Sequence, residues 1–156
     1  MVLPKIAQVS PGGQVFFKAV WRGNIEAPLE TKSEEGRYHT RMDMDQTMYL
    51  ATTPETAMQE VAKRWGGDPA EYTVVSARVK LSRCADLTAE ETQGLLKVSE
   101  DDLTGNRWRS CQQVAASLRA RGYEAVLTYS AADRPKGRCL IIFTENFKAT
   151  SGVELE

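Results

Sequence analysis

The stretch TMYLATTPETAMQE, from Thr47 to Glu60, decides the fold, because it joins a short strand to the clearest helix start in the chain. The segment 47–51 has the length and apolar character of a strand. Thr53 is a suitable N-cap, and Pro54 suits the first helical position. Apolar side chains then recur at helical spacing until Gly66 closes the pattern. The sequence therefore predicts a strand followed by a helix, with Glu60 on the flank of the apolar stripe.

Further elements are predicted on both sides of this unit. Apolar runs, alternation and turn residues indicate strands over 15–21, 75–81, 125–129 and 139–143, a helix over 108–121 and a short helix over 88–98. The polar segment 23–46 has no period and predicts a long loop, and loops of this length inside a domain are often functional. No repeat or linker divides the chain. We expect one α+β domain over residues 1–156, with its core at about 15–147.

The composition argues against two classes of protein. With 20 basic and 21 acidic residues the net charge is −1, which lacks the basic excess typical of nucleic-acid binders. No segment approaches the roughly 20 apolar residues of a membrane span. The segment from Met1 to Ser10 has no apolar run of the kind found in signal peptides. We therefore expect a cytoplasmic protein with no nucleic-acid or membrane partner.

Cysteine and histidine give no sign of a metal site. The three cysteines, Cys84, Cys111 and Cys139, are far apart in the sequence and lack the spacing of zinc ligands or a redox pair. We expect three reduced, mostly buried thiols. His39 is the only histidine, which is too few for a metal site or a Ser-His-Asp arrangement.

Candidate functional residues are polar side chains at the points where apolar elements end, since rigid scaffolds present reactive groups there. Each also has an ordinary structural explanation, such as packing, solvation or a turn hydrogen bond. The candidates are Arg22 at the end of the first strand, Arg37 and Tyr38 in the long loop, Tyr49 in a strand, Glu60 on the first helix, and Ser130 after a strand.

The order of several short segments resembles the RES domain family, named for an Arg, a Glu and a Ser. The matching segments are Val20-Trp21-Arg22, Gly36-Arg37-Tyr38, Tyr49-Leu50-Ala51, the helix segment 54–60 ending in Glu60, Arg121-Gly122-Tyr123, Tyr129-Ser130 and Leu140-Ile141-Ile142-Phe143. They run in order over about residues 15–147. Two positions depart from the pattern, because His39 and Cys139 stand where many members have Asn.

The resemblance implies a fold and an activity. The fold is ADP-ribosyltransferase-like, with mixed and antiparallel sheets and flanking helices around an NAD cleft between two small sheets. The reaction is cleavage of the nicotinamide–ribose bond of NAD, the substrate, with ADP-ribose passing to water, to phosphate or to a protein acceptor. The family also implies a toxin with an Xre-type antitoxin protein as partner. No metal is implied.

The same resemblance gives roles to the candidate residues. A carboxylate near the ribose stabilises an oxocarbenium-like charge, and Glu60 takes this role. Tyr49 offers an aromatic face to nicotinamide. Arg37 and Arg22 suit the pyrophosphate, since Arg provides a fixed fork of donors, and Ser130 orients Glu60 or the ribose. Tyr38 is expected beside the ligand.

Two other functions stay open from the sequence. One is a binding module of the same fold that has lost turnover, suggested by His39 and Cys139 at the usual Asn positions. The other is an unrelated hydrolase with two carboxylates, using Asp43 with Asp45 or Asp101 with Asp102.

Overall fold

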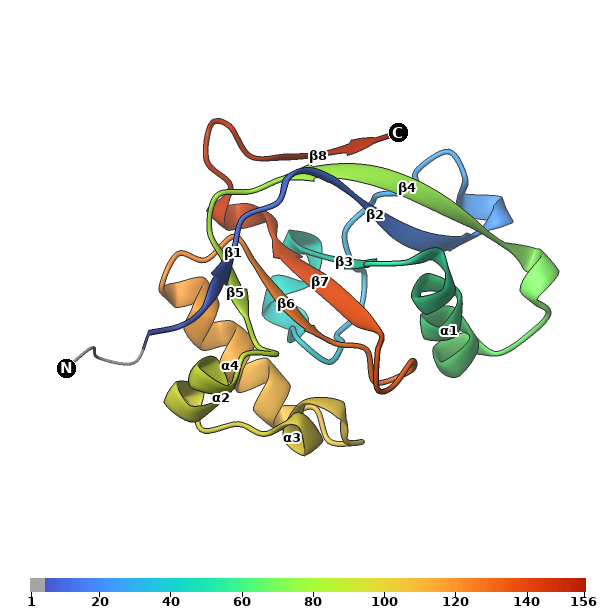
Figure 1. The fold of residues 1–156 in the computed structure, drawn as a ribbon. Helices are drawn as coiled ribbons and strands as arrows, with labels where there is room; N and C mark the ends of the chain where they lie inside the picture. Colours follow the sequence, from blue (N-terminus) through green and yellow to red (C-terminus); the bar gives the residue numbers. More distant parts are fainter. Residues whose placement is uncertain (1–4) are drawn as a thin grey trace.

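The strand and helix predicted from Thr47 to Gly66 form as β3 (Thr47–Ala51) and α1 (Pro54–Trp65) in a computed structural model that describes residues 5–156 (Figure 1). Residues 1–4 of the N-terminal segment lie outside the described residues. Thr53 caps α1 by accepting a hydrogen bond from the backbone N–H of Thr56. Gly66 ends the helix at φ 66°, a backbone conformation that favours glycine.

Among residues 5–156, eight strands form one mixed sheet in the order β1-β5-β6-β7-β3-β2-β4-β8. Only β5 and β6 are parallel; every other pair is antiparallel. The remaining strands are β1 (Gln8–Val9), β2 (Gly12–Trp21), β4 (Tyr72–Lys80), β5 (Cys84–Asp86), β6 (Ala125–Tyr129), β7 (Arg138–Phe143) and β8 (Gly152–Leu155).

The sheet has a weak seam between β2 and β3. These strands share a single residue pair, Phe17 with Ala51, whereas β3 pairs with β7 at five positions and β2 pairs with β4 along nearly its whole length. Helix α1 packs against the seam through small side chains, with Ala57 against Ala19 and Ala51. The resemblance implied two small sheets. The described residues instead form one sheet whose two groups of strands diverge at this seam.

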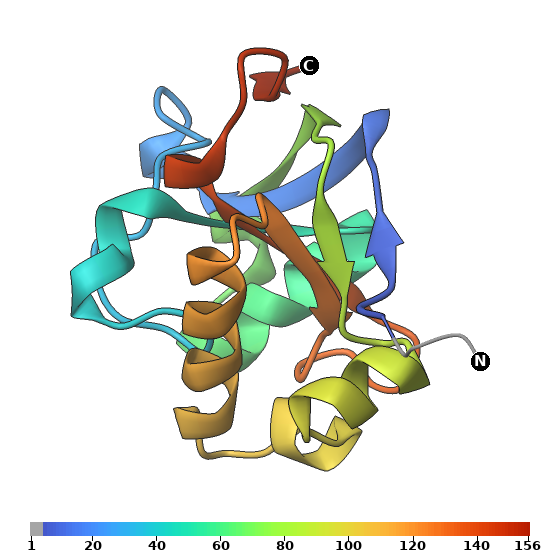
Figure 2. The ribbon, with the colours of Figure 1, turned by 90° about the vertical axis from the view of Figure 1, so that its left-hand side faces the viewer.

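Three helices cover the face of the sheet on which Ile141 and Phe143 of β7 lie: α2 (Glu90–Leu96), α3 (Glu100–Thr104) and α4 (Arg109–Ala120). Figures 1 and 2 show them gathered near the β5–β6 end, whereas α1 lies at the β2 end. The alternate β7 residues, Leu140 and Ile142, face a second core that also contains Phe16 and Val79 from the other group of strands. No helix in the described part of the chain is long and apolar enough to cross a membrane.

The structure adds elements that sequence patterns did not predict. Strands β1, β5 and β8 are only 2, 3 and 4 residues long, too short to show alternation. Helix α3 has a capping box between Ser99 and Asp102, but its five residues hold a single large apolar side chain, Leu103. The long loop 23–46 is confirmed as mainly irregular, apart from short 3-10 turns at Arg22–Asn24 and Arg41–Gln46.

One buried carboxylate ties together the β4–β5 turn, the start of β6 and the segment before β8. Glu124 is fully buried, and its Oε1 accepts hydrogen bonds from the N–H groups of Ser82 and Arg83 and from the Ser82 hydroxyl. The Ser151 hydroxyl donates to Oε2. Burial acts to raise the pKa of Glu124, but these hydrogen bonds outweigh it and hold the pKa below its usual value. Glu124 is therefore a carboxylate in the folded protein at neutral pH.

We predict that Glu124→Gln lowers the free energy of unfolding at pH 7 by about 1–3 kcal/mol, the range for losing hydrogen bonds to a buried charged group. Because the folded-state pKa is lowered, the contribution of the carboxylate is present above the ordinary pKa of 4.5 and lost as the pH falls through the folded value. The difference between the variant and the wild type should therefore shrink in acid. Denaturant unfolding at several pH values, with Glu91→Gln on the exposed side of α2 as control, measures this; a pH-independent difference would contradict it.

Candidate active site

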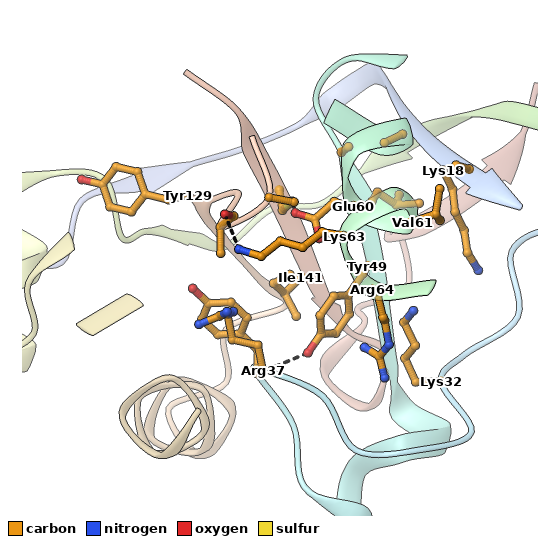
Figure 3. A pocket seen from close by; sticks show the side chains of 18 of the residues that line it. Lys18, Lys32, Arg37, Tyr49, Glu60, Val61, Lys63, Arg64, Tyr129 and Ile141 are labelled. Atoms are coloured by element: carbon orange, nitrogen blue, oxygen red, sulfur yellow. Dashed lines mark hydrogen bonds between the residues drawn. The ribbon is translucent and has the colours of Figure 1, made fainter. Parts of the chain in front are cut away.

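A cleft with a cavity volume of about 510 Å³ lies where α1, β2, β3 and the ends of β6 and β7 meet the loop that contains Arg37. This volume is in the range of small-molecule sites. Figure 3 shows side chains from these elements pointing into it. Among the described residues, its charged lining consists of one acid, Glu60, and five basic residues: Lys18, Lys32, Arg37, Lys63 and Arg64. The cleft therefore suits a ligand with negative charge.

Glu60 is held from one side. It lies on the second turn of α1, and its Oε1 accepts hydrogen bonds from the Ser130 hydroxyl at 2.5 Å and from the Cys139 thiol at 3.3 Å. Ser130, at the end of β6, also accepts the N–H of Asp133, so its hydroxyl both donates and accepts. Both Ser130 and Cys139 are buried, which fixes the carboxylate in position.

Tyr49 on β3 is fixed by its hydroxyl. That hydroxyl accepts the N–H of Tyr38 at 2.7 Å and lies 2.9 Å from Nδ1 of His39. The other ring nitrogen of His39, Nε2, is 2.5 Å from the carbonyl oxygen of Glu34, which can only accept. Nε2 therefore carries the proton, and Tyr49 donates to Nδ1. Burial lowers the pKa of His39, which favours this neutral form.

Arg37 and Tyr38 come from the long loop. The Arg37 guanidinium donates to the carbonyl oxygen of Gly105 at 2.5 Å, and it also approaches Leu103 at the end of α3. Tyr38 is 2% exposed, and its hydroxyl forms a hydrogen bond with the Thr128 hydroxyl at 2.7 Å. Its ring therefore contributes to the wall of the cleft, and its hydroxyl is not free to bind a ligand. The structure thus brings Glu60, Tyr49, Arg37 and Tyr38 to one cleft, with Ser130 directly behind Glu60.

Arg22 does not reach the cleft. It is exposed, and its Nε donates to the carbonyl oxygen of Ala70 at 2.8 Å, in the 3-10 turn directly before β4. The residue of β2 that supplies a cation to the cleft is Lys18. Lys18 is the only charge within the apolar run from Val15 to Trp21, and this isolated charge was the sequence signal for it.

The basic side chains repel one another. Lys32 lies with its Nζ 5.1 Å from the centre of the Tyr49 ring. Burial, together with the charges of Lys18 and Arg64, lowers the pKa of Lys32 to about 8. Burial also lowers the pKa of Lys18, although the charge of Glu30 partly offsets it. Holding these cations together therefore costs stability, which an anionic ligand would relieve.

Other candidate groups lie elsewhere. The pairs Asp43 with Asp45 and Asp101 with Asp102 lie on a 3-10 turn and on α3, and neither pair lines the cleft. The three cysteines are confirmed as buried free thiols. Within residues 5–156, no group of three or more His, Cys, Asp or Glu side chains is placed to hold a metal ion.

Comparison with known proteins identifies the family. The family model of the RES domain matches residues 15–155. The chain belongs to the RES domain family. The match confirms the resemblance drawn from the short segments and extends it through the last strand, β8.

Two further proteins are similar to this RES domain. A Mycoplasma pneumoniae protein described as an uncharacterized lipoprotein is 31% identical over 101 residues, which are 63% of this chain and 13% of that protein. The chain thus spans about one eighth of that relative's length. A chain in the crystal structure of the M. tuberculosis MbcT–MbcA toxin–antitoxin complex has a TM-score of 0.71 at 17% identity, covering 96% of this chain and 84% of that one. This likeness confirms the α+β fold.

We predict that Lys32→Met stabilises this RES domain at pH 7 by about 1–3 kcal/mol. Each lowering of the Lys32 pKa by one means that folding disfavours the charged ammonium by about 1.4 kcal/mol, and methionine carries no charge. The penalty on charged Lys32 is present below its folded pKa of about 8 and disappears as the pH rises toward the ordinary 10.5. The gain should therefore shrink between pH 8 and 10.5. Thermal and denaturant unfolding over this range measure it, with Lys148→Met, at an exposed lysine outside the cleft lining, as control. A variant less stable than the wild type at pH 7 would contradict it.

Proposed function

We propose that this RES domain cleaves the nicotinamide–ribose bond of NAD in the cleft around Glu60. The observation that carries the proposal is the arrangement of Glu60: one carboxylate oxygen is bound by Ser130 and Cys139, and the carboxylate lines a cleft that also presents the ring of Tyr49. Membership of the RES domain family supports the same activity, because the resemblance to that family is what implied NAD as the substrate.

The chemistry needs a fixed negative charge. When the C–N bond breaks, its electron pair passes to the nicotinamide ring nitrogen, which becomes neutral, and positive charge develops on the ribose. A carboxylate beside the ribose stabilises that charge, and it acts best when held in place before the reaction. Glu60 is the only carboxylate among the described lining residues, so we give it this catalytic role.

Tyr49 suits the nicotinamide ring. Nicotinamide in NAD carries a positive charge, and an aromatic face attracts cations. Because the Tyr49 hydroxyl is occupied by Tyr38 and His39, the role we propose for Tyr49 belongs to its ring.

The basic lining suits the pyrophosphate. Arg37 keeps the role expected for it, and its bond to Gly105 fixes the guanidinium at the edge of the cleft. Arg22 lies outside the cleft, so Lys18, Lys32 and Arg64 are the further candidates for phosphate contacts. The acceptor of ADP-ribose is water, phosphate or a protein, and product analysis with and without phosphate distinguishes these.

The inactive binding module is the weaker alternative. It was suggested by His39 and Cys139 at positions where many relatives have Asn. Here His39 pairs with the Tyr49 hydroxyl and Cys139 donates to Glu60, so both replacements retain hydrogen bonds to the proposed catalytic side chains. We therefore favour an active enzyme.

We predict that Glu60→Gln remains folded but loses about two to three decades of NAD cleavage, because an amide offers no full negative charge to the oxocarbenium ion. Nicotinamide release from NAD, followed by chromatography, measures the rate. Glu55→Gln, in the exposed first turn of the same helix, is the matched control and should keep wild-type turnover. Equal turnover in a folded Glu60→Gln variant would remove Glu60 from the mechanism.

We also propose an inhibitory partner, an Xre-type antitoxin that covers the cleft. The fold resemblance to a chain from a toxin–antitoxin complex supports this. The contact regions we expect are the loop 23–46 and the rim 130–138, both of which border the cleft, with the exposed Trp65 beside them. A stable interface needs about 800 Å² on each side, and we expect these segments and the end of α1 to supply that area together.

Expressed alone in bacterial cytoplasm, the protein should stop growth while cellular NAD falls. Co-expression of the antitoxin should restore growth, and the Glu60→Gln variant should be harmless at the same expression level. Growth curves and a metabolite assay after induction test this. Normal growth with steady NAD, from a protein that is expressed and folded, would favour the inactive module.

A further inference from the structure

Cys139 is a polar side chain of the cleft to which the proposed reaction gives no direct part. Cys139 lies on β7 opposite Ala51 of β3 and Thr128 of β6, and it is 6% exposed. Cys139 lines the cleft, and its Sγ lies 3.3 Å from Glu60 Oε1, the oxygen that also accepts the Ser130 hydroxyl. Two donors from two neighbouring strands therefore meet on one oxygen of the carboxylate.

The second carboxylate oxygen is left for the ligand. Within the described part of the chain, Glu60 Oε2 makes no hydrogen bond, and it is not among the buried side-chain atoms without a partner. It is therefore accessible to solvent, in a residue that lines the cleft. Because only Oε1 is bound, the carboxylate keeps one orientation and presents Oε2. A carboxylate free to rotate would present either oxygen.

The thiol is suited to donate and unsuited to react. Burial, followed by the negative charge of Glu60, raises the pKa of the Cys139 thiol well above its usual value. The sulfur therefore keeps its proton at neutral pH and offers it to Glu60. Because a neutral donor does not cancel the charge of the carboxylate, Glu60 keeps the full negative charge that the proposed reaction requires.

We propose that Cys139 is a positioning residue: together with Ser130 it fixes Oε1 of Glu60, so that Oε2 faces the bound ribose. This inference rests on the proposed role of Glu60. It differs from a packing role for the thiol, because a packing role would affect stability without changing the proton affinity of Glu60.

The test compares Cys139→Ala, Cys139→Ser and Cys84→Ala. Cys84 is also fully buried but contacts neither Glu60 nor the cleft, so its substitution creates a comparable space elsewhere. The Glu60 side-chain carboxyl is titrated by carbon NMR, with its signal assigned through Glu60→Gln. Removing a donor disfavours the charged form, so the Glu60 midpoint should rise in Cys139→Ala and should stay near that of the wild type in Cys139→Ser and Cys84→Ala.

The second readout is the pH profile of NAD cleavage. In Cys139→Ala, kcat should fall about three- to tenfold with little change in KM, the loss expected for one hydrogen bond, and the acid limb of the profile should move toward neutral pH. Cys139→Ser should restore the position of that limb. An unchanged Glu60 midpoint in folded Cys139→Ala would overturn the proposal. If the wild-type protein did not cleave NAD, the proposed function would fail, while the titration would still decide whether Cys139 holds Glu60.

Discussion

The cleft depends on the seam at which β2 and β3 share a single residue pair. If these strands paired along their whole length, the sheet would continue flat past β3 and leave no recess at this edge. Their divergence instead creates a wedge, and α1 fills part of it through Ala57, packed against Ala19 and Ala51. Small side chains at this contact let the helix lie close to the strands. Glu60, one turn further along α1, is thereby brought to β6 and β7, where Ser130 and Cys139 bind it.

The charges of the cleft oppose stability and favour binding. Five basic side chains and one acid line the same recess, and the lowered pKa values of Lys18 and Lys32 indicate that the folded chain holds these two lysines there at a cost. A structural role would not require this, because exposed lysines are fully solvated without penalty. Anionic ligands recover the cost on binding, since they both pair with the cations and relieve their mutual repulsion. This balance is typical of sites in which local instability serves function.

The sequence predicted the parts of this site that local patterns determine. The strand 47–51 and the helix cap at Thr53 follow from side-chain preferences within a few residues, and the structure confirms them. Arg22 was predicted to lie beside the ligand, but in the structure it follows β2 and bonds to Ala70, whereas Lys18 of β2 lines the cleft. Which side chain reaches the cleft is decided by contacts with segments distant in the sequence. The short strands β1, β5 and β8 exist only through their partners. Non-local pairing is therefore what the sequence patterns missed.

The two residues that depart from the pattern expected by resemblance, His39 and Cys139, share one physical property. His39 contacts the Tyr49 hydroxyl and Cys139 contacts Glu60, so each lies directly behind a side chain of the cleft. Burial lowers the pKa of the imidazole and raises that of the thiol, so both groups are uncharged at neutral pH. An asparagine is also an uncharged hydrogen-bonding group. In this chain both positions therefore provide polarity without charge. Neutral donors and acceptors fix the geometry of Tyr49 and Glu60, and they leave the charge of the described cleft lining to Glu60 and the basic residues around it.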